Sequence, residues 1–98
     1  MPHSDDVADL ISPIEKELQG ERASALGAAG RRIEAALAAL ADAADPTPLD
    51  DKLDAAATAV WHYIIVRESL RFFDHEAALH HYSVPDRVMA RVGVVKRR

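Results

Sequence analysis

The stretch DPTPLDDKL, residues 45–53, divides the sequence into two helical halves. Its opening Asp-Pro pair predicts the end of one helix, because proline cannot continue a helix and disfavours helical backbone in the residue before it. Thr47 is then placed to cap the next helix, with Pro48 at its first position and Asp50 three residues after the cap. A connection this short predicts that the two flanking helices lie antiparallel.

Before this boundary the sequence predicts a long helix over residues 14–44, with a start or a kink at Pro13. Its apolar seam alternates steps of four and three residues through Leu26, Gly30, Ile33, Leu37, Leu40 and Ala44. The two glycines at positions 27 and 30 each cost about 1 kcal/mol relative to alanine in a helix. We therefore predict that an aromatic side chain from another helix approaches the backbone there, with a flexible hinge as the alternative.

After the boundary a second long helix is predicted over residues 48–73. Apolar residues occupy three of its faces: Ala56, Ala59, Tyr63, Val66, Leu70 and Phe73; Trp61, Ile65 and Phe72; and Leu53, Val60 and Ile64. A helix this apolar is either central in its bundle or shared between subunits. Because only one other long helix is available to cover it, we expect a second subunit.

Two short helices are predicted next. Asp74 is placed to cap a helix over residues 75–82. Ser83, with Asp86 three residues later, forms a capping-box pattern for a helix over residues 85–92. The sequence therefore predicts two short helices folded back across one end of the long pair.

The chain of 98 residues is long enough for one core, so residues 1–98 are predicted to form a single helical domain. Residues 1–12 are predicted to form a loose N-terminus, Gly93 to stop the last helix, and residues 94–98 to form a basic tail. The predicted fold class is all-α, a compact helical bundle of two long antiparallel helices and two short C-terminal ones.

Composition favours a cytoplasmic protein. The chain has no cysteine, which suits a reducing compartment, and its N-terminus lacks the basic-then-apolar order of a signal peptide. No apolar run approaches the roughly twenty residues that a membrane span needs. The net charge of −4 is unevenly divided, because residues 1–54 carry most of the acidic side chains and residues 55–98 most of the basic ones.

The basic C-terminal half raises the alternative of nucleic-acid binding. Residues 77–92 have the rhythm of a helix-turn-helix, and the candidate phosphate contacts are Arg87, Arg91, Lys96, Arg97 and Arg98. Against this, Leu79 stands where a small residue usually lets the two helices cross. The second helix also lacks the amide side chains that read base edges. The net negative charge of the chain as a whole opposes binding to nucleic acid.

A metal site is not predicted. Glu76 and His80 are the right distance apart to share a helix face. His75 is five residues from His80 and six from His81, so it points elsewhere, and His62 is more than two turns away on another helix. A zinc site needs at least three protein ligands. No cofactor is expected, and no motif for catalysis is present: there is no glycine-rich phosphate loop and no serine elbow.

Glu68 is the carboxylate of most interest. It lies on the predicted face of Trp61, Ile65 and Phe72, where an unpaired charge is unfavourable. The arginines that could pair with it are Arg31, Arg32, Arg67 and Arg71. We predict structural ion pairs, which can fix helix register more than they stabilise.

Two segments, ASALGAAGRRIEAALAAL (23–40) and WHYIIVRESLRFFDHEAALHHYSVPDRVMARVG (61–93), resemble a small uncharacterised family of all-α bacterial proteins, a domain of unknown function. The matching marks are LGAAGRR, the Arg67–Glu68 pair, and the spaced run from Tyr82 to Gly93. Val66 stands where the family pattern has glutamine, which weakens a polar role for that face. The resemblance implies a compact helical fold and no particular activity.

The sequence thus favours a non-enzymatic interaction or structural protein that forms a homodimer, with an unidentified protein as a further partner. The predicted contact surface is the face formed by Trp61, Ile65 and Phe72. Nucleic-acid binding is the alternative, and no membrane contact is expected.

Overall fold

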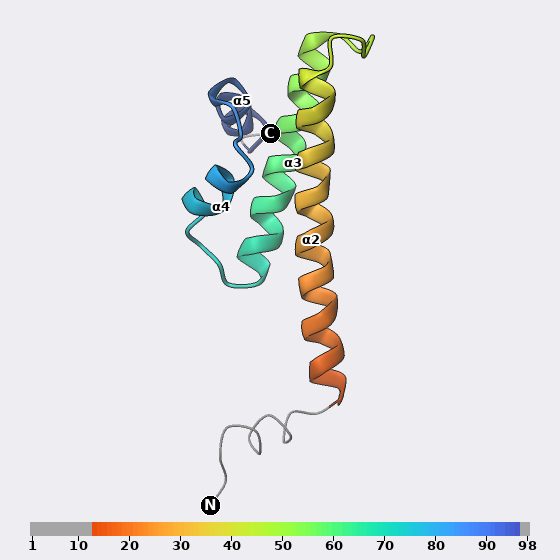
Figure 1. The fold of residues 1–98 in the computed structure, drawn as a ribbon. Coiled ribbons are helices and arrows are strands. Elements are labelled where there is room, and N and C mark those ends of the chain that lie inside the picture. The colour runs from red at the N-terminus through yellow and green to blue at the C-terminus, as the bar shows by residue number, and fades with distance from the viewer. Residues whose placement is uncertain (1–12, 97–98) are drawn as a thin grey trace, which may run out of the picture.

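A computed structural model describes residues 13–96 (Figure 1). This part of the chain forms four helices and no strand: α2 (Pro13–Ala41), α3 (Leu49–Ser69), α4 (Glu76–His81) and α5 (Asp86–Lys96). The all-α fold of two long and two short helices is therefore confirmed. The predicted loose N-terminus and the last two residues of the predicted basic tail lie outside the described residues.

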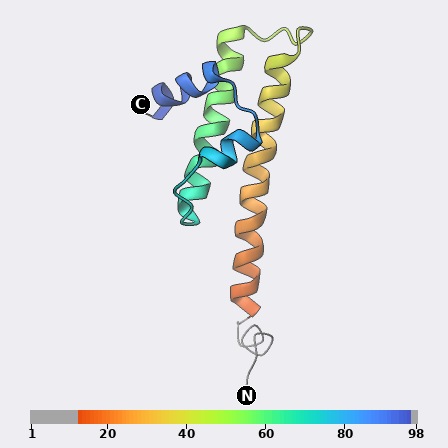
Figure 2. The same cartoon turned by 60° about the vertical axis from the view of Figure 1, so that its left-hand side comes forward.

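The two long helices, α2 and α3, pack side by side as an antiparallel pair (Figures 1 and 2). Side chains shape their connection: Oδ1 of Asp42 accepts from the N–H of Ala44 at 2.9 Å, and Oδ1 of Asp45 accepts from the N–H of Thr47 at 2.8 Å. The predicted cap at Thr47 is wrong. The N-cap position belongs to Pro48, with no side-chain hydrogen bond, and the backbone N–H of Thr47 is bound by the preceding aspartate instead.

The core lies where α3 meets α2 on one side and α5 on the other. Ile33, Val60 and Val88, one from each of these helices, are the largest fully buried side chains of the described residues. The other buried apolar residues are Ala29, Leu53, Ala56, Ala57, Ala59, Tyr63, Ile64 and Val92. Fully burying a Val or Ile side chain stabilises a fold by roughly 1.5–3 kcal/mol. Because α5 covers a second side of α3, a second subunit is not needed to explain every apolar face of that helix.

The two short helices lie beside α3, at different levels along its length, rather than across one end of the long pair (Figures 1 and 2). Near the end of α3, Arg67 donates from Nε to Nδ1 of His75 at 3.1 Å, which holds the start of the returning chain. Near the beginning of α3, Arg91 of α5 binds the carboxylates of Asp50 and Asp54. The returning chain therefore contacts α3 near both of its ends.

A Schellman motif ends α3 at Ser69, four residues before the predicted end. Arg71 has a left-handed backbone, with φ 70°, and its N–H donates to the carbonyl of Glu68 at 3.0 Å. The N–H of Phe72 donates to the carbonyl of Arg67, also at 3.0 Å. These two bonds satisfy carbonyls that the last turn would otherwise leave free.

The same motif ends α4. Ser83 has φ 54°, its N–H donates to the carbonyl of His80 at 3.0 Å, and the N–H of Val84 donates to the carbonyl of Leu79 at 3.5 Å. The prediction that Gly93 stops the last helix is wrong, because α5 continues through Gly93 and ends at Lys96. A glycine stops a helix by adopting a left-handed conformation, and no described glycine has a positive φ.

The predicted close approach of an aromatic ring to a helix glycine is confirmed at Gly30. A Cβ atom built on Gly30 would collide with the hydroxyl of Tyr82 and lie 2.9 Å from its ring carbon Cζ. The ring of Tyr82 also packs edge-on against Tyr63 of α3, with 5.3 Å between the ring centroids. At Gly27, in contrast, the nearest atom to such a Cβ is Nη1 of Arg31 at 3.3 Å.

Candidate interaction surface

The predicted contact face of Trp61, Ile65 and Phe72 is divided in the structure. Trp61 is half-buried and Ile65, one turn later on α3, is 45% exposed. Phe72 is 50% exposed, but it follows the end of α3 and does not continue the helical face. The prediction assumed that the helix runs to Phe73, so the Schellman motif at Arg71 is the reason for the difference.

The Trp61 side of this surface borders an open groove of about 610 Å³, which we call the central groove. Small side chains from α2 and α3 line much of it, and Trp61 and His62 complete it. The other lining residues are Arg32, Ala36, Asp54, Ala55, Thr58 and Ala59. A large aromatic ring beside small side chains is an arrangement in which a partner's side chains can reach the backbone closely.

Phe72 borders a second groove, of about 360 Å³, which we call the terminal groove. Its lining residues are Arg22, Ala23, Leu26, Leu70 and Phe72. The terminal groove lies where the end of α3 meets α2, and its lining is mostly apolar. The next residue along the chain, Phe73, is 63% exposed, so large apolar surface continues past the groove.

Arg67 fixes the chain that carries these phenylalanines. Its guanidinium lies 5.3 Å from the ring centroid of Phe72 and 6.0 Å from that of Tyr63, in cation–π geometry. It also donates from Nη2 to the carbonyl of Asp74 at 2.8 Å and from Nε to Nδ1 of His75. Arg67 therefore contacts the ring of Phe72 while three other groups hold its guanidinium: the ring of Tyr63, the carbonyl of Asp74 and Nδ1 of His75.

The predicted ion pairs of Glu68 are not formed. Among the described residues, no guanidinium of Arg31, Arg32, Arg67 or Arg71 lies within salt-bridge distance of its carboxylate. Glu68 is half-buried rather than enclosed, so solvent still reaches it. Arg67, its neighbour in sequence, is engaged with the loop and two aromatic rings instead.

The candidate nucleic-acid contacts are dispersed. Arg91 donates from Nη1 to Asp54 at 2.8 Å and from Nη2 to Asp50 at 2.9 Å, and these hydrogen bonds raise the pKa of Arg91 above its usual value. Its guanidinium therefore faces two carboxylates on α3. Lys96 ends α5, while Arg97 and Arg98 lie outside the described residues.

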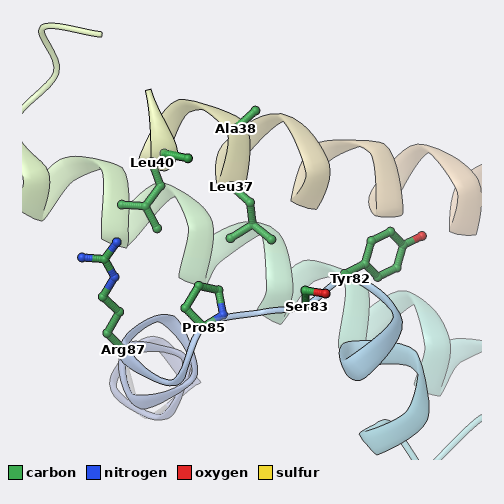
Figure 3. Close-up of a pocket in the computed structure, with 8 residues that line it drawn as sticks. Leu37, Ala38, Leu40, Tyr82, Ser83, Pro85 and Arg87 are labelled. Atoms are coloured by element: carbon green, nitrogen blue, oxygen red, sulfur yellow. The ribbon is translucent and has the colours of Figure 1, made fainter. Parts of the chain in front are cut away.

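Arg87 borders a third groove, of about 390 Å³, between the end of α2 and the turn that joins α4 to α5 (Figure 3). Leu37 and Leu40 of α2 point toward Pro85 across this groove, and Arg87 lies at the Leu40 end (Figure 3). Arg87 is exposed, whereas the guanidinium of Arg91 is bound by two carboxylates.

A family-level sequence comparison matches residues 6–98 to a family of unknown function (DUF6665). The chain belongs to this family. The match covers the four helices of residues 13–96, in agreement with the resemblance seen in the sequence. No curated protein and no solved structure matches the chain. The family carries no assigned activity, so the geometry of the described surface must support any proposal.

Glu76 and His80 line one shallow pocket together with Asp74 and Ala77. Among the described residues, no group of three or more His, Asp or Glu side chains is placed to hold a metal ion. Within the same part of the chain, no helix has both the length and the apolar character required to cross a bilayer.

Sequence reasoning missed several contacts that shape this surface. Arg91 binds Asp54 and Asp50, which precede it in the chain by 37 and 41 positions. No local sequence pattern reveals contacts over such a separation. Nζ of Lys52, a buried residue, donates to the carbonyl of Asp42 at 3.1 Å and ties α3 to the connection. The sequence signal for these contacts is charge. Acidic residues lie in the first turn of α3, where a basic side chain can bind them, and a lysine follows them directly.

Proposed function

We propose that this chain is a small helical protein-interaction module, homodimeric and without catalytic activity. The observation that carries this proposal is the exposure of large apolar side chains beside grooves. Ile65, Phe72 and Phe73 expose between 45% and 63% of their surface, and Phe72 lines the terminal groove. Phe72 and Phe73 are adjacent in the chain, and an exposed apolar patch of this kind commonly marks a site of contact with another protein.

Trp61 and Ile65 form the part of this surface that best fits a partner other than the chain itself. Tryptophan is among the residues that contribute most to binding energy at interfaces. Trp61 is half-buried, so part of its ring is already fixed by the fold, and three alanines are among the residues that line the central groove beside it. A fixed aromatic side chain loses little conformational entropy when it binds.

Binding rather than catalysis is supported by the sequence, which contains no recognised nucleophile, phosphate-loop or metal-ligand motif. The absence of cysteine fits a reducing compartment, so we place the protein in the cytoplasm. The resemblance to bacterial proteins supports a bacterial origin.

The proposal is tested first by the solution mass, measured by light scattering over a dilution series with and without a chelator. We expect the mass of two chains at high concentration, falling toward one chain on dilution, with no effect of the chelator. A mass of one chain at every concentration would contradict the homodimer.

The fluorescence of Trp61, the single tryptophan, then tests which surface is covered. If self-association buries its ring, the emission moves to shorter wavelength as the concentration rises. If the mass doubles while the emission stays constant, the central groove remains open to a different protein. Ile65→Lys is the companion variant, because Ile65 is exposed one turn from Trp61, and Leu49→Lys is its control at another exposed aliphatic position of α3.

A further inference from the structure

Helix α2 extends beyond the helix that it packs against. The level at which α3 ends is marked by the terminal groove, where Leu70 and Phe72 meet Arg22, Ala23 and Leu26 of α2. Residues 13–21 of α2 lie past that level, and no other described helix lies beside them (Figures 1 and 2). At 1.5 Å per residue these nine residues project by roughly 13 Å.

The projecting residues continue helix α2, which is already formed, so they need no separate nucleation. Most helical stability in proteins nevertheless comes from packing of an apolar face. In the sequence, the apolar spacing of this helix already includes Ile14 and Leu18, before the level at which α3 ends. A neighbour packed against the projecting turns would therefore stabilise them, and none of the other described helices lies beside them.

We propose that this neighbour is a second copy of the chain, arranged so that residues 13–21 of each α2 lie in the terminal groove of the other copy. This inference rests on the proposed self-association and assigns its contact surface. The arrangement is isologous: each copy contributes one projecting helix end and one groove, so the contact closes on itself as a two-fold dimer. It also covers Phe72, which is half exposed in the single chain.

Charge supports the same pairing. Residues 13–21, PIEKELQGE, contain three glutamates and one lysine. The terminal groove that would receive them is bordered by Arg22, and the exposed Arg71 follows Leu70 directly in the chain. An acidic segment against a basic rim gives electrostatic complementarity, which favours association and fixes orientation.

The test uses a charge placed in the groove. Ala23 is exposed and lines the terminal groove, so Ala23→Glu introduces a buried charge only if the second copy covers it. Ala25→Glu is the matched control, because Ala25 is an equally exposed alanine of the same helix and lines none of the described grooves. We expect Ala23→Glu to raise the dimer dissociation constant by at least about tenfold. Ala25→Glu is expected to leave it unchanged.

A second variant tests the occupant rather than the groove. Leu18→Glu is expected to weaken the dimer as Ala23→Glu does, because both positions belong to the same contact.

The outcomes separate the two proposals. If Ala23→Glu and Ala25→Glu both dimerise as the natural chain does, the terminal groove is not the interface, although the self-association itself stands. If Ala23→Glu weakens the dimer and Leu18→Glu does not, another part of the second copy fills the groove and the inference is overturned. A natural chain that is monomeric throughout overturns both proposals.

Discussion

The ring of Tyr82, between α4 and α5, lies directly against the backbone of Gly30 in α2. There is no room for a Cβ atom at this point, because it would collide with the tyrosine hydroxyl. The same ring packs edge-on against Tyr63 of α3. One glycine therefore allows a single side chain to join the returning chain to both long helices.

Replacing this glycine should destabilise the fold. In Gly30→Ala the new methyl group must displace Tyr82, and overpacking of this kind typically costs about 1–3 kcal/mol, which outweighs the gain of about 1 kcal/mol in helix propensity. We expect a lower free energy of unfolding, measured by urea denaturation followed by circular dichroism.

Gly27→Ala is the control for this substitution. The nearest atom to a Cβ at that position is the guanidinium end of Arg31, a flexible side chain that can move aside. Here the propensity gain of up to about 1 kcal/mol should dominate, so the variant is expected to be more stable. Equal effects at the two glycines would show that the ring of Tyr82 does not restrict Gly30.

The environment of Tyr82 also predicts an alkaline limit to stability. Burial, followed by the neighbouring Tyr63, raises the pKa of Tyr82 above its usual value of 10.0. A raised pKa means that the folded state binds this proton more tightly than the unfolded state does. Its stabilisation is complete below pH 10 and is lost as the pH rises from there through the folded-state pKa.

The measurement is the free energy of unfolding as a function of pH above neutrality, compared between the natural chain and Tyr82→Phe. The natural chain is expected to lose stability more steeply above pH 10. Phenolate absorbance of the folded protein gives an independent check, since Tyr82 should ionise later than a free tyrosine. Parallel stability curves for the two proteins would contradict the assigned environment.

The helical hairpin could be predicted from the sequence because its signals are local. The stretch DPTPLDDKL lies between α2, which ends at Ala41, and α3, which begins directly after Pro48. The seam through Ile33 and Leu37 has the spacing of one helix face. The close approach at Gly30 was also predictable, because a glycine among strong helix formers is unfavourable without a packing reason.

The contact surface was harder to predict because the end of α3 carries no sequence signal. Helices usually end with glycine in the left-handed position, whereas this chain has Arg71 at the end of α3 and Ser83 at the end of α4. Without a glycine, the apolar spacing of Trp61, Ile65 and Phe72 is read as one helix face. The chain reversal then separates Phe72 from the other two.

This unusual helix end offers a stabilising substitution. A non-glycine residue with left-handed backbone is unfavourable by roughly 1–2 kcal/mol, and glycine removes most of that strain. Arg71 is exposed, and its side chain makes no hydrogen bond among the described residues. Arg71→Gly should therefore raise the free energy of unfolding by on the order of 1 kcal/mol.

Arg71→Ala separates backbone strain from loss of the charge. Alanine keeps the left-handed strain, so this variant should resemble the natural chain in a thermal melt while Arg71→Gly melts higher. If alanine and glycine raise the melting temperature equally, removal of the arginine charge is the cause and the strain argument fails.

The ion pairs of Arg91 with Asp50 and Asp54 join α5 to the beginning of α3. Arg91→Gln removes the cation and leaves two carboxylates close together, so we expect a lower melting temperature. Arg87→Gln is the matched control, because Arg87 lies in the same helix, is exposed, and makes no ion pair within the described chain. Its melting temperature should stay near that of the natural chain.

Salt should reduce the difference between these two variants, because surface charge interactions are screened at high ionic strength. The same pair also informs the nucleic-acid alternative. If either arginine contacts phosphate, its loss should weaken binding to generic duplex DNA at low salt and reduce the salt dependence of that binding. If Arg91→Gln lowers the melting temperature and leaves any DNA affinity unchanged, the role of Arg91 is to hold α5 against α3.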